Sequence, residues 1–557
     1  MRVRISGEPA VTRSLPTESL LKSILCSLSF VSFAATCAVS ATPSSDLTGI
    51  DRVLDEGLNH GEVVETAEYL ADSIGGRMTN SPAMREAERW TQAKFRDFGL
   101  KNVHTEGFDF GRGWWIESSH VRMVVPRPLD LRAIPVAWTP GTDGALRAPI
   151  IVAPMRTERD FADYKDKLAG KIVLMSWPAP PKDLTDAPFR RLGDADFAKH
   201  TPFELPSWDP EAKDKEIARE LFAVKAIAFI AQEGGLACVR MAYRDGHLVS
   251  GEGYTQQVGR TPALPGVELA AEDYRRLARL AKRGPVEIEI DSRIHFEDAD
   301  HNAYNVIADL PGRDPKAGYV MAGAHLDSWV AGDGAADNGA GSAVVIEAAR
   351  ILSRISVTPK RTIRFALWAG EEQSLYGSAD YVAKHLARRP QPTDPEIAAL
   401  GPYFGSDTFP VEPLPGFTEL KAYFNIDNGS GKVRGIYAEG NVAAMPLLHM
   451  WLAPFESLGA NTVAAGHTGG TDHVFLSRIG LPAFQFIQDP LDYGSRVHHS
   501  DIDTFDHLRA DDLRQAAVVL AGVLLEAANS DEVLPHQTLP TEPRVTDPYS
   551  YPEPSKP

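Results

Sequence analysis

Acidic and imidazole side chains follow four apolar runs of the sequence, and these residue types bind metal ions or move protons. His325 and Asp327 come directly after the run 318–324, and Asp337 lies in the Gly- and Ala-rich bend that follows. The other runs are followed by polar groups as well: 361–369 by Glu371 and Glu372, 420–426 by Asp427, and 482–488 by a loop with the segment HHSDIDT, which begins with His498 and His499. Gly, Asp and Asn are also the ordinary residues of a polar turn. Four runs that end in such groups favour a shared site over a simple turn.

A sheet is the element that would bring these groups together. Between residues 302 and 529, strand-like apolar runs alternate with helical segments, of which the last is 511–529. This alternation is typical of an α/β sheet with crossover connections, and ligands bind at the carboxyl ends of the strands in such sheets. The sequence therefore predicts an α/β fold with a mixed, mostly parallel central sheet flanked by helices, and with the polar groups at one edge.

The chemistry that suits this set of side chains is a pair of zinc ions. Zinc takes His nitrogen and carboxylate oxygen, and a two-metal site needs one carboxylate to bridge the ions and a water held between them. His325 and Asp337 are the natural pair, with Asp337 as the bridge, because the Gly and Ala residues around it let the backbone bend sharply. Of the adjacent Glu371 and Glu372, one can bind metal while the other accepts a proton from the water. Asp327, two residues after His325, is expected to orient the imidazole rather than to bind metal.

The histidines after the last run leave two assignments open. Either His498 or His499 can complete the site, although a single loop histidine is more often structural than a ligand. No role is assigned to the other candidates, which are His301, His467, His473 and His507. The residue types alone do not choose between His498 and His499.

The chain is large, acidic and of ordinary globular composition. Its 557 residues exceed what one hydrophobic core usually supports, so two or more domains are expected. Hydrophobic residues make up 43% and charged residues 24%, which argues against fibrous and disordered classes. The net charge of -18 argues against a nucleic-acid partner, because binding a phosphate backbone requires clustered Lys and Arg.

The start of the chain predicts export. Three arginines precede the apolar stretch 20–41, and small residues permit cleavage after Ala41, so residues 1–41 are predicted as a signal peptide of a periplasmic or secreted protein. A retained membrane anchor is the alternative, but the stretch is short and interrupted for a spanning helix. The residues before Cys37 fit a lipidation signal poorly. Cleavage would leave Cys238 as the single cysteine, and therefore no internal disulfide.

The rest of the chain divides into four segments by pattern. A helical segment, 47–120, precedes a strand-rich segment, 121–295. The apolar runs of the strand-rich segment are interpreted as short strands: 148–154, 170–180 and 226–232. The alternating segment, 296–530, is the catalytic candidate, and a Pro-rich tail, 531–557, is expected to be irregular.

Five ordered motifs resemble the M28 family of co-catalytic zinc exopeptidases, close to its plasma glutamate carboxypeptidase-like branch. The motifs are HLDSW with GAADNGAGSAVVIEAARIL, RFALWAGEEQSLYGSADYV, FNIDNGSG, GGTDHVFL and HHSDIDT. The resemblance covers residues 51–113 and 302–529. It implies a metallo-exopeptidase, acting as an aminopeptidase or as a dipeptidase or carboxypeptidase, that hydrolyses small peptides with a water activated by two Zn²⁺.

The resemblance also implies a metal role for each matching residue. His325, Asp337 and Asp427 would hold one zinc, and Asp337, Glu372 and His499 the other. His499 is preferred because the ligand of the family stands directly before Ser or Thr. The family has a non-proline cis peptide after the bridging aspartate, which here predicts a cis bond between Asp337 and Asn338.

Two catalytic roles are implied as well. Glu371 would be the general base that deprotonates the water held between the metals. Many bacterial aminopeptidases of the family place a tyrosine near the last histidine ligand to stabilise the oxyanion, whereas here Val497 and His498 precede His499. His498 could donate a hydrogen bond to the developing oxyanion, or it could simply pack.

The strand-rich segment is similar, more loosely, to the protease-associated domain often inserted in this family, where it would lie over the cleft and shape substrate access. Two other functions stay open: a glutaminyl cyclase-like acyl transfer on one zinc, and a non-catalytic, receptor-like binding protein. The expected partners are small peptide substrates, with no nucleic acid and no stable membrane insertion after signal removal. A homodimer is left open.

Overall fold

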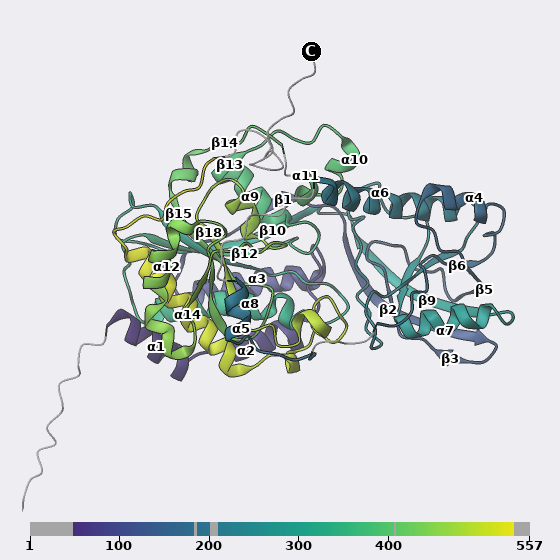
Figure 1. Ribbon diagram of the computed structural model, residues 1–557, viewed down its shortest axis with the longest axis horizontal. Coiled ribbons are helices and arrows are strands. Elements are labelled where there is room, and N and C mark those ends of the chain that lie inside the picture. The colour runs from purple at the N-terminus through teal and green to yellow at the C-terminus, as the bar shows by residue number, and fades with distance from the viewer. Residues whose placement is uncertain (1–47, 183–186, 201–209, 406–407, 540–557) are drawn as a thin grey trace, which may run out of the picture. The chain divides into compact units, whose positions relative to one another are not determined.

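Two eight-stranded sheets organise the protein (Figure 1). The computed structural model describes residues 48–182, 187–200, 210–405 and 408–539. The predicted signal peptide, with Cys37, lies outside these residues, as does the tail beyond residue 539. The strands of one sheet come from both sides of an insertion in the sequence, and the strands of the other come from the insertion itself.

The central sheet has the strand order β1-β10-β12-β11-β15-β18-β16-β17. Its strands are β1 (Lys101–Asp109), β10 (Asn302–Leu310), β11 (Tyr319–His325), β12 (Thr362–Trp368), β15 (Leu420–Asn425), β16 (Val433–Tyr437), β17 (Thr462–Ala464) and β18 (Ala483–Gln488). Strands β12, β11, β15 and β18 are parallel, whereas β10 is antiparallel to both neighbours and β16 is antiparallel to β18. The predicted mixed, mostly parallel sheet is confirmed, and its four parallel strands are those that the polar groups follow.

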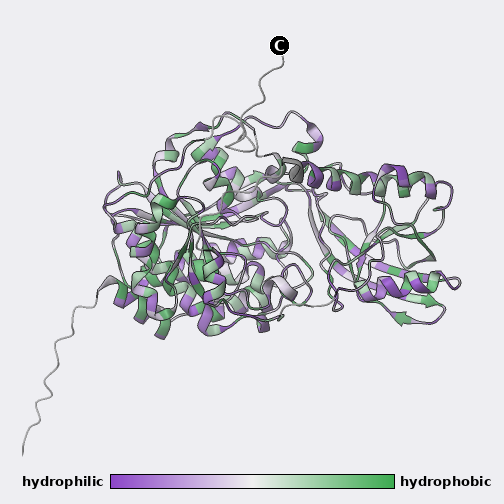
Figure 2. Cartoon of the chain, viewed as in Figure 1, coloured by the Kyte–Doolittle hydropathy of each residue, from purple (hydrophilic) through white to green (hydrophobic). Residues whose placement is uncertain are grey.

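Alternate side chains of β11 supply the two faces of this sheet, because successive residues of a strand point to opposite sides. Val320, Ala322 and Ala324 belong to the larger core with residues of α8 (Ala340–Arg354) and α14 (Ala510–Asn529). Tyr319 and Met321 belong to a second core with residues of α9 (Tyr376–Tyr381) and α13 (His473–Ser477). Helix α3 (Pro82–Asp97) also packs on β1 and β10. Helices α1 (Gly49–Asn59) and α2 (Val63–Glu68) pack on α8 and α14. Figure 2 shows the strands between these layers as predominantly hydrophobic.

The inserted sheet has the strand order β3-β2-β9-β5-β6-β7-β8-β4. Its strands are β2 (Gly113–Val125), β3 (Leu129–Asp130), β4 (Ala133–Pro135), β5 (Leu146–Val152), β6 (Ile172–Leu174), β7 (Ala237–Met241), β8 (Gly266–Leu269) and β9 (Glu287–Glu297). Helix α7 (Ala271–Ala281) packs on β5 and β7. The shorter elements elsewhere are α4 (Phe161–Tyr164), α5 (Asp194–His200), α10 (Pro395–Ala398), α11 (Pro402–Gly405), α12 (Met445–Leu452), β13 (Ala387–Arg388) and β14 (Glu412–Pro413).

One predicted strand of the insertion is wrong. Residues 226–232 form the end of helix α6 (Pro210–Gln232) rather than a strand. Ala226 and Ile230, four residues apart, are both fully buried, and Phe229 stacks on Phe161 at a centroid distance of 4.3 Å. The run is short and apolar, so its helical period is visible only when the preceding turns of α6 are included.

The described residues contain no helix that is both long and apolar enough to cross a membrane. They contain one cysteine, Cys238 on β7, which is free and buried. Burial raises the pKa of its thiol to about 12. The thiolate is the reactive form, so Cys238 is expected to be inert in the folded protein.

This inertness is measurable with the chain cut after Ala41. A chromogenic disulfide reagent at pH 8 is expected to label less than about a tenth of a thiol per folded chain within an hour, and one thiol per chain in denaturant. Rapid labelling of the native protein would contradict the buried position of Cys238.

Candidate functional site

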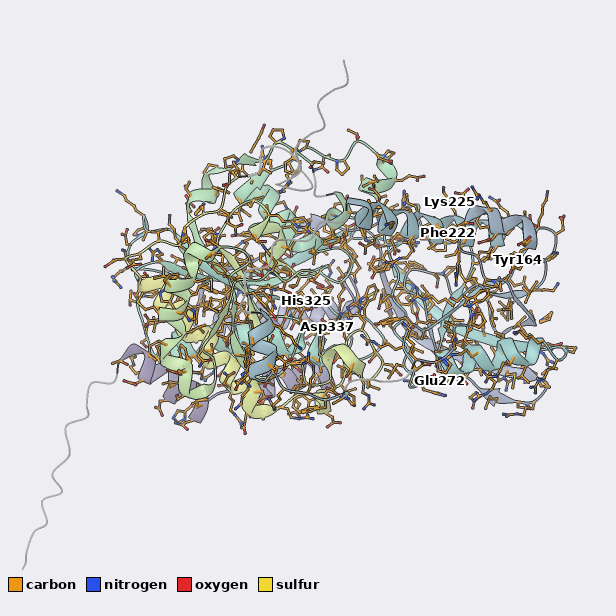
Figure 3. All side chains as sticks on the ribbon, in the orientation of Figure 1. Tyr164, Phe222, Lys225, Glu272, His325 and Asp337 are labelled. Carbon is orange, nitrogen blue, oxygen red and sulfur yellow. The ribbon has the colours of Figure 1, made fainter. Side chains whose placement is uncertain are left out.

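The imidazole of His325, at the end of β11, faces three carboxylates. Its Nε2 atom lies 3.3 Å from Asp337 Oδ1, 3.7 Å from Asp427 Oδ1 and 3.9 Å from Glu371 Oε2. Its Nδ1 atom lies 3.0 Å from the carbonyl oxygen of Asp327, which can only accept, so Nδ1 carries a proton. The Nε2 atom therefore faces the carboxylates, an arrangement that requires a cation between them or a second proton on the ring. Figure 3 shows His325 and Asp337 close together.

A second imidazole approaches Asp337 from the loop after β18. The Nε2 atom of His499 lies 3.0 Å from Glu372 Oε2 and 3.3 Å from Asp337 Oδ2. The ring of His498 stacks on that of His499 at a centroid distance of 3.6 Å, but its Nε2 atom is 3.8 Å from Asp337 Oδ2. His499 thus contacts two carboxylates of the site, whereas His498 lies at its rim.

These side chains form three overlapping groups that could each hold a metal ion, with one potential ligand atom per residue and all such atoms within 4.8 Å of one another. The groups are His325, Glu371 and Asp427; His325, Asp337 and Glu372; and Asp337, His498 and His499. Among the described residues, His325 Nε2, Asp337 Oδ2 and Glu372 Oε1 are buried without a hydrogen-bond partner. Buried polar atoms are rarely left without a partner, so this set of nitrogen and carboxylate donors fits zinc.

The electrostatics of the cluster also favour a bound cation. Burial raises the pKa of Glu371 well above its usual value, and Asp427 adds to the shift while His325 opposes it. Burial and the neighbouring Asp337 raise the pKa of Glu372 to about 7. Burial acts to lower the pKa of His325, but Glu371 and Asp427 hold it well above its usual value. So many buried carboxylates stay ionised together only beside positive charge.

A kinked turn, η3 (Ala335–Gly339), brings Asp337 to the centre of the cluster. The Asp337–Asn338 peptide is cis, which confirms that prediction. Asp503 accepts hydrogen bonds from the backbone N–H groups of Ala336 and Asp337, at 2.6 and 3.0 Å. The side chain of Asn338 donates to the carbonyl of Ile426 at 3.0 Å, directly before Asp427. The turn is therefore bonded both to the β15 end and to the loop that carries the two histidines.

Arg77 lies fully buried beneath this turn. Its guanidinium donates to the carbonyl oxygens of Leu326, Asp333 and Gly334 at 2.7–2.8 Å, and to those of Leu70 and Gly75 at 3.2 and 3.0 Å. The N-terminal segment is thereby tied to both ends of the loop between His325 and Asp337.

The contact that orients His325 differs from the predicted one. The carboxylate of Asp327 lies 3.7 Å from His325 Nδ1, beyond hydrogen-bond distance, and the backbone carbonyl of Asp327 bonds the ring instead. The carboxylate accepts from Thr79 Oγ1 at 2.9 Å and from the backbone N–H groups of Glu371 and Glu372 at 3.3 Å each. Asp327 thus positions the adjacent glutamates as well as the histidine.

Three further residues lie at the site that were not predicted from the sequence: Glu252, Asp472 and Asp503. Glu252, from the insertion, lies 3.0 Å from His499 Nδ1. Asp472, at the start of α13, is fully buried, and burial raises its pKa to about 8. Asp472 and Asp503 stand inside the motifs GGTDHVFL and HHSDIDT, so these motifs offered a signal that could have found them, whereas no linear signal points to Glu252.

A small, partly open hollow lies beside the cluster. It is lined by Asp337, Glu372 and His499 together with Trp329, Gly332, Gly334, Ser500 and Asp503. The hollow therefore adjoins the side of the cluster between Asp337 and His499.

Comparisons with known proteins agree with this site. A family model described as "Peptidase family M28" matches residues 305–524. Carboxypeptidase Q of Mus musculus is 23% identical over 475 residues, covering 85% of this chain and 86% of that protein, and carboxypeptidase Q of Xenopus laevis is 36% identical over 329 residues, covering 58% and 61%. A solved peptidase M28 precursor from Shewanella amazonensis has a TM-score of 0.62 at 23% identity, with 88% of this chain and 98% of that chain covered.

Three observations fall in the same part of the chain. They are the sequence motifs, the clustered donors at the ends of β11, β12 and β15, and the family match over residues 305–524. The fold agrees with that of the Shewanella amazonensis protein over most of both chains. Residues 305–524 are therefore a domain of peptidase family M28, and the protein is a metallopeptidase.

Proposed function

We propose that the protein is a metallo-exopeptidase that cleaves small peptides with a water activated by two Zn²⁺. The observation that carries the proposal is the convergence on Asp337 of two separate donor groups, one on the His325 side and one on the His499 side. Two groups that share one carboxylate suit a two-metal site, and a glutaminyl cyclase-like reaction on one metal would need only one of them.

The contacts around His325 and His499 support the following ligands. His325, Asp337 and Asp427 would hold one zinc, and Asp337, Glu372 and His499 the other. Two bound Zn²⁺ would supply Lewis acidity, polarising the scissile carbonyl and lowering the pKa of a water.

Glu371 is the general base of this proposal. Its carboxylate is buried and lies 3.9 Å from His325 Nε2, in the bend shortly after β12. It accepts one proton from the attacking water as the oxygen bonds the carbonyl carbon. The same proton is then delivered to the leaving amine nitrogen when the C–N bond breaks, which balances the hydrolysis.

His498 is proposed to donate a hydrogen bond to the developing oxyanion. The ring is partly exposed, with 31% of the side chain accessible, and its Nε2 atom lies 3.8 Å from Asp337 Oδ2. It therefore stands between the bridging carboxylate and solvent, where a substrate carbonyl would enter.

The names of similar proteins support exopeptidase action but differ in direction. Carboxypeptidase Q acts, by its name, at the carboxyl end, and a zinc aminopeptidase from Bacillus subtilis shares the fold with a TM-score of 0.55 at 18% identity, with 84% of this chain and 95% of that chain covered. We further propose that residues 121–295 form a protease-associated type of domain that limits the site to small peptides, and that residues 1–41 direct export.

Removal of metal tests the proposal directly. Purified protein is expected to contain two zinc ions per chain, to lose at least about 100-fold in activity after dialysis against a chelator, and to recover with two equivalents of Zn²⁺. The substrates are an unblocked dipeptide, an aminoacyl anilide and an N-blocked dipeptide, so the preferred one gives the direction of cleavage. One zinc per chain without hydrolysis of any of the three would contradict the proposal and favour the cyclase.

Substitution of the two adjacent histidines separates their roles. His499→Ala is expected to lower the zinc content from two to one per chain, because it removes a proposed ligand. His498→Ala is expected to retain two and to lose about 10–100-fold in kcat, with little change in KM. If the His498 variant lost zinc instead, His498 would be the ligand and His499 would not.

A further inference from the structure

We propose that the insertion supplies Glu252 as a positioning residue for His499, so that the second metal position is complete only when this part of the chain is docked. The inference rests on the proposed function, because it takes His499 as a zinc ligand. The sequence alone gives the insertion no residue in the metal cluster, whereas this inference places Glu252 beside it.

The contact between the two side chains determines which nitrogen faces the metal position. Glu252 Oε1 lies 3.0 Å from His499 Nδ1. A carboxylate only accepts, so Nδ1 must donate its proton to Glu252, and Nε2 is left to face Glu372 and Asp337. A carboxylate behind a ligating imidazole orients the ring and increases its basicity.

His499 needs such support because no regular element holds it. It follows the short turn η8 (Tyr493–Val497) and has a φ of 55°, in the left-handed region that is uncommon for residues other than glycine. Besides the carboxylates of the site, two rings contact His499: His498 stacks on the ring, and Trp329 contacts it edge-on at a centroid distance of 6.1 Å. These contacts restrict the plane of the ring but do not select the nitrogen that faces the metal.

The segment that carries Glu252 is bonded to the histidine loop close by. The N–H of Val249 donates to Asp501 Oδ1 at 3.0 Å, and the N–H of Asp501 donates to the carbonyl of Val249 at 3.0 Å. Arg132, before β4, adds a charged bond from Nε to Asp501 Oδ2 at 2.8 Å. These three bonds bring Glu252 beside His499 without help from a metal.

Two glycines let the segment turn Glu252 toward the site. Gly251 has a φ of 69°, and a Cβ there would lie 2.8 Å from the carbonyl oxygen of Pro135. A Cβ at Gly253 would overlap the carbonyl of Ala137. The backbone therefore packs against the β4 region on both sides of Glu252, which leaves this side chain to reach His499.

Three variants test the assignment: Glu252→Ala, Glu252→Gln and the control Glu117→Gln. Glu117 is matched in chemistry, since its carboxylate lies 2.6 Å from His295 Nε2 within the inserted sheet. Zinc affinity is measured by competition with a chelator, alongside kcat and KM. Glu252→Ala is expected to weaken one of the two zinc positions by about 10–100-fold, and Glu252→Gln less, because the amide oxygen still accepts. Glu117→Gln is expected to match the wild type.

A further variant covers the case in which the Glu252 variants fold poorly. Arg132→Gln removes the charged bond to Asp501 while leaving Glu252 and every proposed ligand in place, and the arginine side chain is 52% exposed. It is expected to weaken the same zinc position several-fold with an unchanged midpoint of thermal unfolding. Equal zinc affinities for wild type, Glu252→Ala and Arg132→Gln would overturn the inference. A wild type that binds fewer than two zinc ions would instead contradict the proposed function itself.

Discussion

Glu371→Gln is expected to lower kcat by about 10²–10⁴-fold while the protein retains two zinc ions per chain. The amide has the size of the carboxylate but cannot take a proton from water at neutral pH. Glu371 is also the carboxylate that pairs with His325 at the longest distance of the three, 3.9 Å, so its loss leaves the closer contacts with Asp337 and Asp427 in place. The measurements are steady-state hydrolysis of the preferred substrate and metal analysis of the same sample.

The adjacent residue provides the matched control. Glu372→Gln makes the same chemical change one position further along, where the carboxylate contacts His499 at 3.0 Å. It is expected to lower zinc content or affinity as well as activity. Activity of Glu371→Gln close to that of the wild type would contradict the general-base assignment, and loss of zinc from this variant would instead make Glu371 a ligand.

The central part of the site is predictable from sequence because parallel strands end at the same edge of a sheet. His325 ends β11, and β11 pairs in parallel with β12 on one side and β15 on the other. Glu371 comes shortly after β12 and Asp427 shortly after β15, so the three side chains lie close together. Asp337 is predictable for a different reason, because it lies in the bend that connects β11 to α8.

The remaining contacts depend on long-range packing that leaves no linear signal. Glu252 lies in a loop of the inserted sheet, and Asp501 joins this loop to the histidine segment through backbone bonds. The sequence shows that Asp327 is near His325. It does not show that the backbone carbonyl of Asp327, rather than its carboxylate, bonds the imidazole. The end of helix α6 is wrongly predicted as a strand because a run of six apolar residues and one glutamine is too short to display a helical period.

Arg77 connects the N-terminal segment to the loop between His325 and Asp337. It lies in the range 51–113 of the family resemblance, but only the structure shows that its guanidinium bonds backbone carbonyls on both sides of the loop. These are the carbonyls of Leu70, Gly75, Leu326, Asp333 and Gly334. Burial lowers the pKa of Arg77, and Asp503 opposes this shift, yet an arginine stays charged at neutral pH. A buried cation is thus surrounded by carbonyl dipoles and by Asp503, which itself holds the N–H groups of Ala336 and Asp337.

Arg77→Met is expected to destabilise the fold by roughly 3–5 kcal/mol, because methionine fills the space but leaves several buried carbonyls without their donor and Asp503 without a nearby positive charge. The same change loosens Asp333 and Gly334, which lead into the turn of Asp337, so zinc affinity is expected to fall with stability. Denaturant unfolding of the metal-free and zinc-loaded forms measures both effects. Arg89→Met, whose side chain is 66% exposed and pairs only with Glu86 among the contacts the structure describes, is the control and is expected to change stability by less than about 0.5 kcal/mol. If Arg77→Met unfolded at the wild-type denaturant concentration, the guanidinium would be dispensable, and the turn would be held by Asn338 and Asp503 alone.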